Sequence, residues 1–303
     1  MYIFSEMNQS PTVKCLRFEE KLPLDFETKV QTLAGSHPME FKMYLQINGC
    51  GVLMKLTDCS NPQNQVCIDV KKIRDDRIIK TTLRTCIAHF KISECELKIQ
   101  WQFFATIQSV MTILNKTKIS SVYLEQRKET EIHPEEVLDA LRKASNVTIF
   151  WDCEGFYPKT KVKPFHFEKL DMKEAKWVTG KHLTRMFMDC KHLILNRSVL
   201  TSTQQELNRF RLTNSEIKTF LKRWMEGSNL RRVETGIKTG INLKSVMKGL
   251  EAIPVEKDWS KAKNGGCYKI KQKNGLEVFV YRDPEFTLTT EDLLKETHFV
   301  NAF

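Results

Sequence analysis

The chain has 303 residues, of which 41% are hydrophobic and 28% are charged, and its formal net charge is +11. This composition is typical of a globular protein with one large or two modest cores, and it excludes a disordered or fibrous chain. Because no apolar run reaches the roughly 20 residues of a membrane helix and residues 1–20 lack the pattern of a signal peptide, we expect an intracellular protein, in cytoplasm or nucleus, that does not contact a membrane.

The N-terminal part of the chain changes character at residue 40. Residues 1–39 form an irregular segment interrupted by prolines, with one short strand predicted over residues 12–18. From residue 40, apolar and polar side chains alternate, which is typical of half-buried strands, and Asn48-Gly49 predicts a β-hairpin between two of them. Further strands are predicted over residues 65–70, 77–89 and 95–99. Residues 40–100 are therefore expected to form a β-rich part.

After residue 101 the hydrophobic period becomes that of alternating helices and strands. Helices are predicted over residues 104–114, 134–142, 179–187, 213–226 and 242–250. Strands are predicted over residues 119–124, 147–151, 192–195 and 230–237. Helix followed by strand, several times over, implies a parallel sheet with helices on its outer face. The spacing is too uneven for a strict repeat, so residues 101–285 are expected to form an irregular, leucine-rich-repeat-like α/β solenoid.

The end of the chain predicts a second hairpin. Residues 267–272 and 277–281 flank Asn274-Gly275, a favoured turn sequence. We expect this hairpin to cap the open edge of the solenoid. Residues 286–303 are expected to form a C-terminal tail with a short helix over residues 292–296.

The most strongly patterned stretch lies between residues 212 and 237. Thr213 and Glu216 have the spacing of a capping box, Leu212 and Ile217 can pack together across the helix start, and Gly227 suits the residue after the last turn. Apolar residues then follow a single helical stripe: Ile217, Phe220, Leu221, Trp224 and Met225. We assign this stripe to the core.

No constellation of residues predicts catalysis. Cys86 with His89, and Cys190 with His192, could each be half of a zinc site, but no second pair of ligands stands at a suitable distance. Asp152-Cys153-Glu154 follows a predicted strand, where an α/β enzyme would place a site, yet it lacks a nearby histidine base. The sequence therefore predicts no catalytic, cofactor-binding or metal site, no cofactor, and a protein that is not an enzyme. An enzyme with a site near residues 152–154 stays open as an alternative.

The positive charge has two interpretations. It fits either an acidic partner such as nucleic acid or a solvated surface spread over several helices, and we favour the second. The basic residues are concentrated in these segments: Lys159-Lys161-Lys163, Lys222-Arg223, Arg231-Arg232, Lys244-Lys248 and residues 261–273. Because they are not interleaved with exposed aromatic residues, nucleic-acid binding is kept only as the alternative function.

Residues 212–230 resemble the signature of the nematode F-box-associated type 2 domain family. The family pattern is a leucine, a threonine with an acidic or amide cap, phenylalanine-leucine-lysine, a tryptophan, and glycine-serine-asparagine before a leucine. The residues that carry this structural signature here are Leu212, Thr213, Glu216, Ile217, Phe220, Leu221, Trp224 and Gly227. Weaker matches at Phe41-x-Met43-x-Leu45, residues 144–147 and residues 191–195 extend the likeness over roughly residues 40–285.

The resemblance implies a function in protein recognition. Members of this family are regarded as substrate-recognition subunits of cullin-based ubiquitin ligases, in which an F-box binds the ligase adaptor and the associated domain holds the target. Residues 1–39 do not show the three-helix pattern of an F-box. The resemblance therefore implies a non-enzymatic module that binds an unknown target protein, with an adaptor contact only where an F-box is present.

Overall fold

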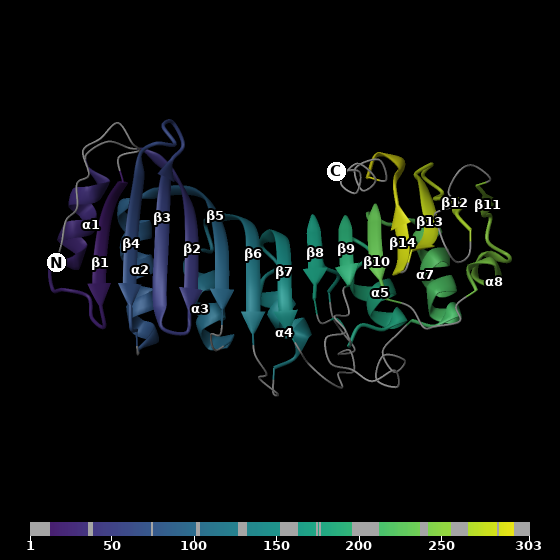
Figure 1. Cartoon of the computed structure of the whole chain (residues 1–303), viewed down its shortest axis with the longest axis horizontal. Coiled ribbons are helices and arrows are strands. Elements are labelled where there is room, and N and C mark those ends of the chain that lie inside the picture. Colours follow the sequence, from purple (N-terminus) through teal and green to yellow (C-terminus); the bar gives the residue numbers. More distant parts are fainter. Residues whose placement is uncertain are drawn as a thin grey trace. The chain divides into compact units, whose positions relative to one another are not determined.

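The computed structural model describes residues 13–35, 39–73, 75–100, 104–126, 132–151, 163–173, 175, 177–195, 212–236, 242–255, 266–283 and 285–293. These residues have an α/β fold with fourteen strands and helices between many of them (Figure 1). The chain divides into two compact units. The first comprises Met1–Arg127 and Glu136–Val147, and the second comprises residues 128–135 and 148–303.

The first unit contains a mixed sheet. Its strands are β1 (Val13–Glu19), β2 (Glu40–Asn48), β3 (Gly51–Asp58), β4 (Gln65–Lys71), β5 (Lys91–Gln100), β6 (Lys118–Gln126) and the start of β7 (Ala144–Trp151). Their spatial order is β1-β4-β3-β2-β5-β6-β7. The predicted hairpin at Asn48-Gly49 is confirmed, since β2 and β3 pair antiparallel. By contrast, β1 is parallel to β4, and β2, β5 and β6 are mutually parallel.

Helices cover one face of this sheet and lie behind the strands in Figure 1. They are α1 (Phe26–Ala34), α2 (Asp76–His89), α3 (Phe104–Ile113) and α4 (Pro134–Ala140). Alternate side chains of each strand are buried on the helical side; in β2 these are Phe41, Met43, Leu45 and Ile47. The core of the unit is the layer between strands and helices.

Two expectations for the first unit are wrong. Residues 77–89 were expected to be strand and instead form α2, whose N-terminus is capped by the Asp75 carboxylate, 2.8 Å from the amide nitrogen of Arg77. The buried positions of α2 have helical spacing: Ile79, Thr82, Leu83 and Cys86. Residues 26–34, expected to be irregular, form α1 with Phe26, Val30 and Ala34 on its buried face. In both segments, packing on one helical face outweighs the local preference of the sequence.

The second unit has a parallel and an antiparallel part. Its strands are β8 (Lys169–Met172), β9 (His192–Leu195), β10 (Arg232–Thr235), β11 (Ile253–Pro254), β12 (Tyr268–Lys271), β13 (Glu277–Asp283) and β14 (Glu285–Thr289). The order is β8-β9-β10-β14-β13-β12-β11. β8, β9 and β10 are parallel, and every later pairing is antiparallel. The helices are α5 (Gly180–Met186), α7 (Asn214–Glu226) and α8 (Leu243–Met247).

The predicted C-terminal hairpin is present, but its place differs from the expectation. β12 and β13 form the hairpin, and β14, which the sequence did not predict, pairs on one side with β13 and on the other with β10. The hairpin therefore does not pair directly with the last parallel strand. Residues 291–293 are helical, whereas the rest of the helix expected over residues 292–296 lies outside the described residues.

When strand β8 is included, the spacing of the helix–strand units is more regular than the sequence suggested. It was not predicted, and with it the starts of β5, β6, β7, β8 and β9 follow one another at intervals of 27, 26, 25 and 23 residues. A common frame of three apolar residues accompanies these strands, at positions i, i+3 and i+5. Examples in which all three side chains are buried are Ile119, Val122 and Leu124 in β6, and Phe167, Leu170 and Met172 at β8.

The helix that carries the sequence signature is held at both ends. Thr213 Oγ1 accepts from the amide of Glu216 at 3.2 Å, and the Glu216 carboxylate accepts from the amide of Thr213 at 3.0 Å, so the predicted capping box is formed. Gly227 follows the last turn with a φ of 149°. Trp224 is fully buried, and its indole nitrogen donates to the carbonyl of Leu230 at 2.9 Å. This bond joins α7 to the segment that leads into β10.

Replacing Trp224 with alanine should lower the free energy of unfolding by about 3–5 kcal/mol, because it leaves a cavity and an unsatisfied carbonyl. Lys222→Ala, at an exposed position of the same helix, should change it by less than about 0.5 kcal/mol. Urea denaturation of the three proteins measures both values. Equal stability of Trp224→Ala and wild type would contradict the burial of this side chain.

Candidate protein-interaction surface

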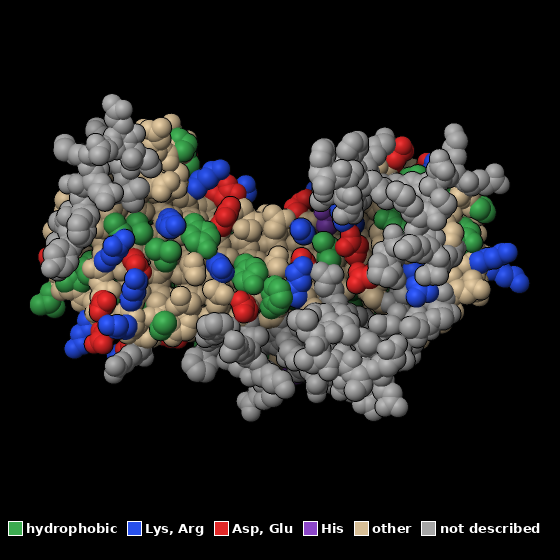
Figure 2. Space-filling view, in the orientation of Figure 1, with side chains coloured by type: hydrophobic (Ala, Val, Ile, Leu, Met, Phe, Trp, Pro, Cys, Tyr) green, Lys and Arg blue, Asp and Glu red, His purple; other side chains and the backbone are tan. Residues whose placement is uncertain are grey.

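The side of the first unit's sheet that faces away from the helices is an open surface of side chains. Strand alternation places these residues there, and all of them are half-buried or exposed. We call this surface the open face and define it by Cys15, Arg17, Lys42, Tyr44, Gln46, Leu53, Lys55, Thr57, Gln65, Cys67, Asp69, Lys71, Glu94, Glu96, Lys98, Gln100, Ser121, Tyr123 and Glu125. Figure 2 shows hydrophobic, basic and acidic side chains interspersed on this face.

Strand register arranges the open face in rows that run across the strands. One row is Cys15, Cys67, Lys55, Tyr44, Glu96 and Ser121. The next row is Arg17, Asp69, Leu53, Gln46, Lys98 and Tyr123. Neighbours in a row lie close enough to interact, so opposite charges and aromatic rings meet across strands.

Two tyrosines are the largest side chains of the open face. Lys98 Nζ lies 5.6 Å from the centre of the Tyr123 ring, a cation–π distance. Tyr44 donates its hydroxyl to Gln46 Oε1 at 3.3 Å, and burial together with the Glu96 carboxylate raises its pKa. Both rings present an apolar body with a polar tip, which is the character of residues enriched in protein interfaces.

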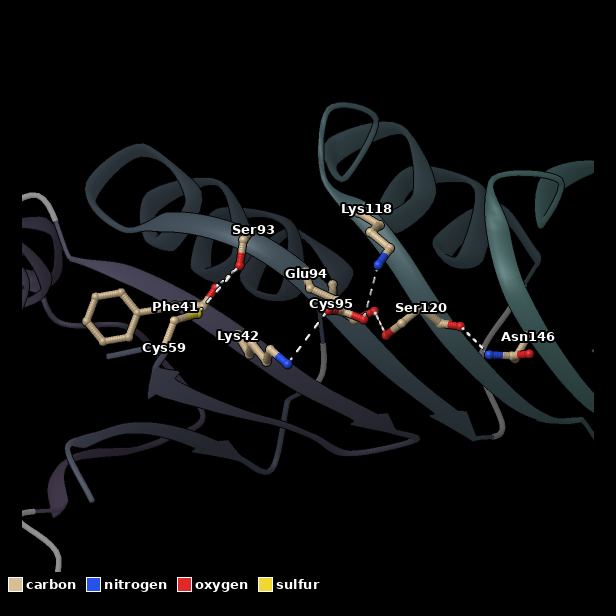
Figure 3. A network of polar contacts seen from close by, with 9 residues as sticks. All are labelled: Phe41, Lys42, Cys59, Ser93, Glu94, Cys95, Lys118, Ser120 and Asn146. Carbon is tan, nitrogen blue, oxygen red and sulfur yellow. Dashed lines mark hydrogen bonds and ion pairs between the residues drawn. The ribbon is translucent and has the colours of Figure 1, made fainter. Parts of the chain in front are cut away.

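A network of polar contacts crosses the N-terminal ends of the parallel strands (Figure 3). The Glu94 carboxylate lies 3.9 Å from Lys42 Nζ and 3.7 Å from Lys118 Nζ, which joins β2, β5 and β6. Both lysines are well exposed, so these ion pairs contribute little to stability. The charges along this edge therefore alternate across the strands: Lys42 is positive, Glu94 is negative and Lys118 is positive.

Two serines in this network occupy bulges. The β2–β5 register passes from Phe41↔Ile92 to Lys42↔Glu94, which leaves Ser93 as the extra residue, and its hydroxyl donates to the Phe41 carbonyl at 3.2 Å. In the same way, the β5–β6 register skips Ser120, whose hydroxyl donates to the Cys95 carbonyl at 3.2 Å. Sequence reasoning missed this feature. Its signal is the triplet Lys-Ile-Ser, which stands at residues 91–93 and again at residues 118–120.

The third member of the series is Asn146 in β7. Its amide nitrogen donates to the carbonyl of Ser120 at 3.0 Å. Each of these polar side chains is the third residue of its strand and bonds to the backbone of the preceding strand (Figure 3). At Ser93 and Ser120, where the register shifts, these bonds link the strands beside a locally disrupted ladder.

The signature residues of the sequence lie in the second unit, and the structure places their apolar members in the core. Leu212, Ile217, Phe220, Leu221 and Trp224 are buried. None of the five contributes an accessible side chain to a binding surface.

Glu216 has a second role that the sequence did not indicate. Besides capping α7, its carboxylate accepts from the amide of Gly180 at 3.0 Å, the first residue of α5. A Cβ at Gly180 would lie 2.7 Å from Glu216 Cβ, so only glycine permits this approach. One carboxylate thus stabilises the N-termini of two helices, where negative charge is favoured.

His182 is a buried histidine close to a carboxylate. Its Nδ1 accepts from the amide of Thr179 at 3.0 Å, which leaves the proton of the neutral ring on Nε2. Nε2 makes no hydrogen bond and lies 3.8 Å from Glu135 Oε1, and the ring packs edge-on against Trp177 at 5.1 Å. Burial lowers the pKa of His182 to about 4, so the ring is neutral at physiological pH.

The cysteine and histidine residues considered as halves of a zinc site make other contacts in the structure. Cys86 is fully buried in α2, and burial raises the pKa of its thiol to about 12, while His89 lies 3.3 Å from Glu27 Oε1. The Cys190 thiol donates to the Phe165 carbonyl at 3.4 Å. Among the described residues, no three His, Cys, Asp or Glu side chains gather as metal ligands would. Asp152, Cys153 and Glu154 lie outside the described residues.

Within the described part of the chain, none of the helices combines the length and apolar character of a membrane span.

Acidification should destabilise the protein partly through His182. Its pKa is 6.5 in the unfolded chain and about 4 in the folded one, so unfolding takes up a proton between these values and stability falls as pH falls. The difference corresponds to at most about 3 kcal/mol, reduced by the attraction of Glu135 for the charged ring.

Denaturation of wild type and His182→Asn at pH 7 and pH 4.5 isolates this contribution. Asparagine offers an acceptor near the place of Nδ1 but does not titrate. Wild type should therefore lose more stability on acidification than the variant. Equal losses in the two proteins would show that His182 does not titrate with a lowered pKa.

Comparison with known proteins gives one relative. No family model matches the chain, and no solved structure matches it. Over 150 residues the chain is 29% identical to the Skn-1 dependent zygotic transcript 15 protein of Caenorhabditis elegans. The match covers 47% of this chain and 39% of that protein, so the chain spans about two fifths of the length of this relative. The chain is therefore similar to a nematode protein over slightly less than half of its own length.

Proposed function

We propose that this protein is a non-enzymatic protein-binding module and that the open face of its first unit holds a protein partner. The observation that carries the proposal is the open face itself: a surface on β1 to β6 that the helices leave uncovered. Its charges are mixed, with Lys55 and Lys98 beside Glu96 and Asp69. A mixed surface with tyrosines suits another folded protein better than it suits a uniformly charged ligand.

The finer architecture we propose is a leucine-rich-repeat-like solenoid. The support is the interval of 23–27 residues between the starts of β5 and β9, which lies in the range of such repeats. The apolar frame at i, i+3 and i+5 also fits the first three leucine positions of that repeat. The bulged serines at residues 93 and 120 occupy equivalent positions in successive strands. Proteins of this architecture bind partners over extended sheet surfaces.

We further propose that the chain belongs with the F-box-associated type 2 domains and recognises substrates for a cullin-type ubiquitin ligase. This step rests on the resemblance at residues 212–230, and the similarity to a nematode protein agrees with it. A contact with the ligase adaptor requires an F-box. Target binding through the open face does not depend on that contact.

The proposal is tested by affinity purification of the tagged chain from nematode extract, with quantification of the recovered proteins. Lys55→Glu, at the centre of the open face, should reduce recovery of the specific partner about tenfold or more, because a reversed charge inside an interface costs over about 1.4 kcal/mol. Arg84→Glu on the exposed side of α2 is the matched control and should leave recovery unchanged.

The same purification separates the two parts of the proposal. Recovery of a partner whose amount responds to Lys55→Glu, without the cullin adaptor, would leave a bare binding module and remove the ligase role. Equal effects of Lys55→Glu and Arg84→Glu would exclude the open face as the binding surface.

The second candidate function is nucleic-acid binding, and one observation favours it. The outer sides of α5, α7 and α8 are strongly basic, and α7 contacts both neighbours. The basic residues are Lys181, Arg185, Lys218, Lys222, Arg223, Lys244 and Lys248. The three helices carry two carboxylates that could offset this positive charge. Glu216 accepts hydrogen bonds at helix N-termini, and Glu226 lies 2.7 Å from Arg223 Nη1. We call this the basic helical surface.

If the basic helical surface binds nucleic acid, the logarithm of the binding constant for a short random-sequence DNA duplex should fall linearly with the logarithm of salt concentration. The double variant Lys222→Glu/Lys244→Glu should weaken binding and reduce the salt slope by about 2, one for each lost phosphate contact. Filter binding measures both quantities, with Lys55→Glu as the control. No retention of the duplex at low salt would exclude this candidate.

A further inference from the structure

Two cysteines of the open face stand side by side on neighbouring strands. Cys15 of β1 and Cys67 of β4 are direct partners in the parallel register, and both are half-exposed. Leu16 and Val66, next to them along the chain, are buried on the helical side, so the two thiols share the opposite face.

The distance between neighbouring strands allows a disulfide bond between Cys15 and Cys67, and this disulfide would be slightly strained. Strands in a sheet lie about 4.8 Å apart, which falls within the range of Cα separations that disulfides span. Parallel Cβ vectors keep the Cβ atoms at about the same separation, slightly beyond the usual disulfide range of about 3.5–4.5 Å. β1 stands at the end of the strand order and pairs with β4 on one side only, so no second neighbouring strand in that order opposes a small approach toward β4.

The surroundings of Cys67 favour its neutral thiol form. Burial, the hydrogen bond with Cys15 and the negative charges of Cys15 and Asp69 raise the pKa of Cys67 to about 12. Cys67 thus keeps its proton at neutral pH. The ammonium of Lys55, paired with Cys67 on the other side, acts in the opposite direction and lowers the pKa of Cys67, but it is the smallest of these effects.

We propose that Cys15 and Cys67 form a reversible disulfide and make the open face sensitive to oxidation by a low-molecular-weight disulfide such as oxidised glutathione. This inference does not depend on the proposed function. A slightly strained disulfide is easily reduced, which suits a reversible modification more than a permanent link.

The reaction proceeds by two exchanges. The Cys15 thiolate attacks one sulfur of oxidised glutathione, which forms a mixed disulfide and releases one glutathione thiolate. The Cys67 thiol then loses its proton and attacks the sulfur of Cys15, which releases the second glutathione thiolate. The two cysteines lose two electrons and two protons in total, and one molecule of oxidised glutathione becomes two of reduced glutathione.

The test is equilibration of the reduced full-length protein in buffers of increasing oxidised-to-reduced glutathione ratio. Free thiols are then blocked by alkylation, and the peptides are identified by mass spectrometry. We expect a cross-linked peptide pair that contains Cys15 and Cys67, and its complete loss after dithiothreitol. Cys50 and Cys59 are exposed on the same unit and serve as internal references for thiols without such a partner.

Three variants complete the experiment. Cys67→Ser should trap a glutathione adduct on Cys15, because the second exchange is missing, and Cys15→Ser should leave Cys67 largely unmodified. Cys50→Ser/Cys59→Ser should form the cross-link at the same glutathione ratio as wild type. Separate glutathione adducts on Cys15 and Cys67, or free thiols at ratios that fully modify Cys50 and Cys59, would overturn the proposal.

Discussion

The alternation of side chains along a β-strand governs the first unit. Each strand has to bury one set of its side chains beneath the helices, since the apolar residues at those positions are the core of the unit. The alternate set of side chains then necessarily points to the opposite side of the sheet and forms the open face. Burial of Leu45 and Leu97 therefore places Tyr44 and Lys98, their neighbours along the chain, on the surface. The composition of the open face is thus a consequence of how the core is made.

The second unit relies on a different interaction, a carboxylate shared between helices. Glu216 satisfies the amide of Thr213 in its own helix and the amide of Gly180 in α5, so two helix starts depend on one side chain. The absence of a side chain at Gly180 allows the approach. The sequence signature that suggested a family thus has a physical explanation inside the fold: Thr213, Glu216 and Trp224 hold a helix, its neighbour and the following strand together.

A helix or strand could be predicted from the sequence where a single hydrophobic period extends over its whole length. Helix α7, strands β2 and β9 and both hairpins follow directly from spacing and turn residues. Residues 77–89 misled because isoleucine and threonine favour strands, and only the packing of α2 reveals the helical period. β8 is too short, at four residues, to show a period. The open face could not be predicted, because the register that brings Cys15 beside Cys67, or Lys98 beside Tyr123, is a tertiary property.

The bulge at Ser120 is a phase shift within a strand. Strict alternation would send Ile119 and Val122 to opposite sides, since they are three residues apart, yet both are buried. The extra residue therefore returns the chain to the correct side before the apolar positions that follow. If Ser120 entered the ladder as an ordinary strand residue, Ile119 would turn outward while Val122 and Leu124 stayed in place. The spacing of three residues between Ile119 and Val122 is therefore compatible with a common buried side only because a bulge lies between them.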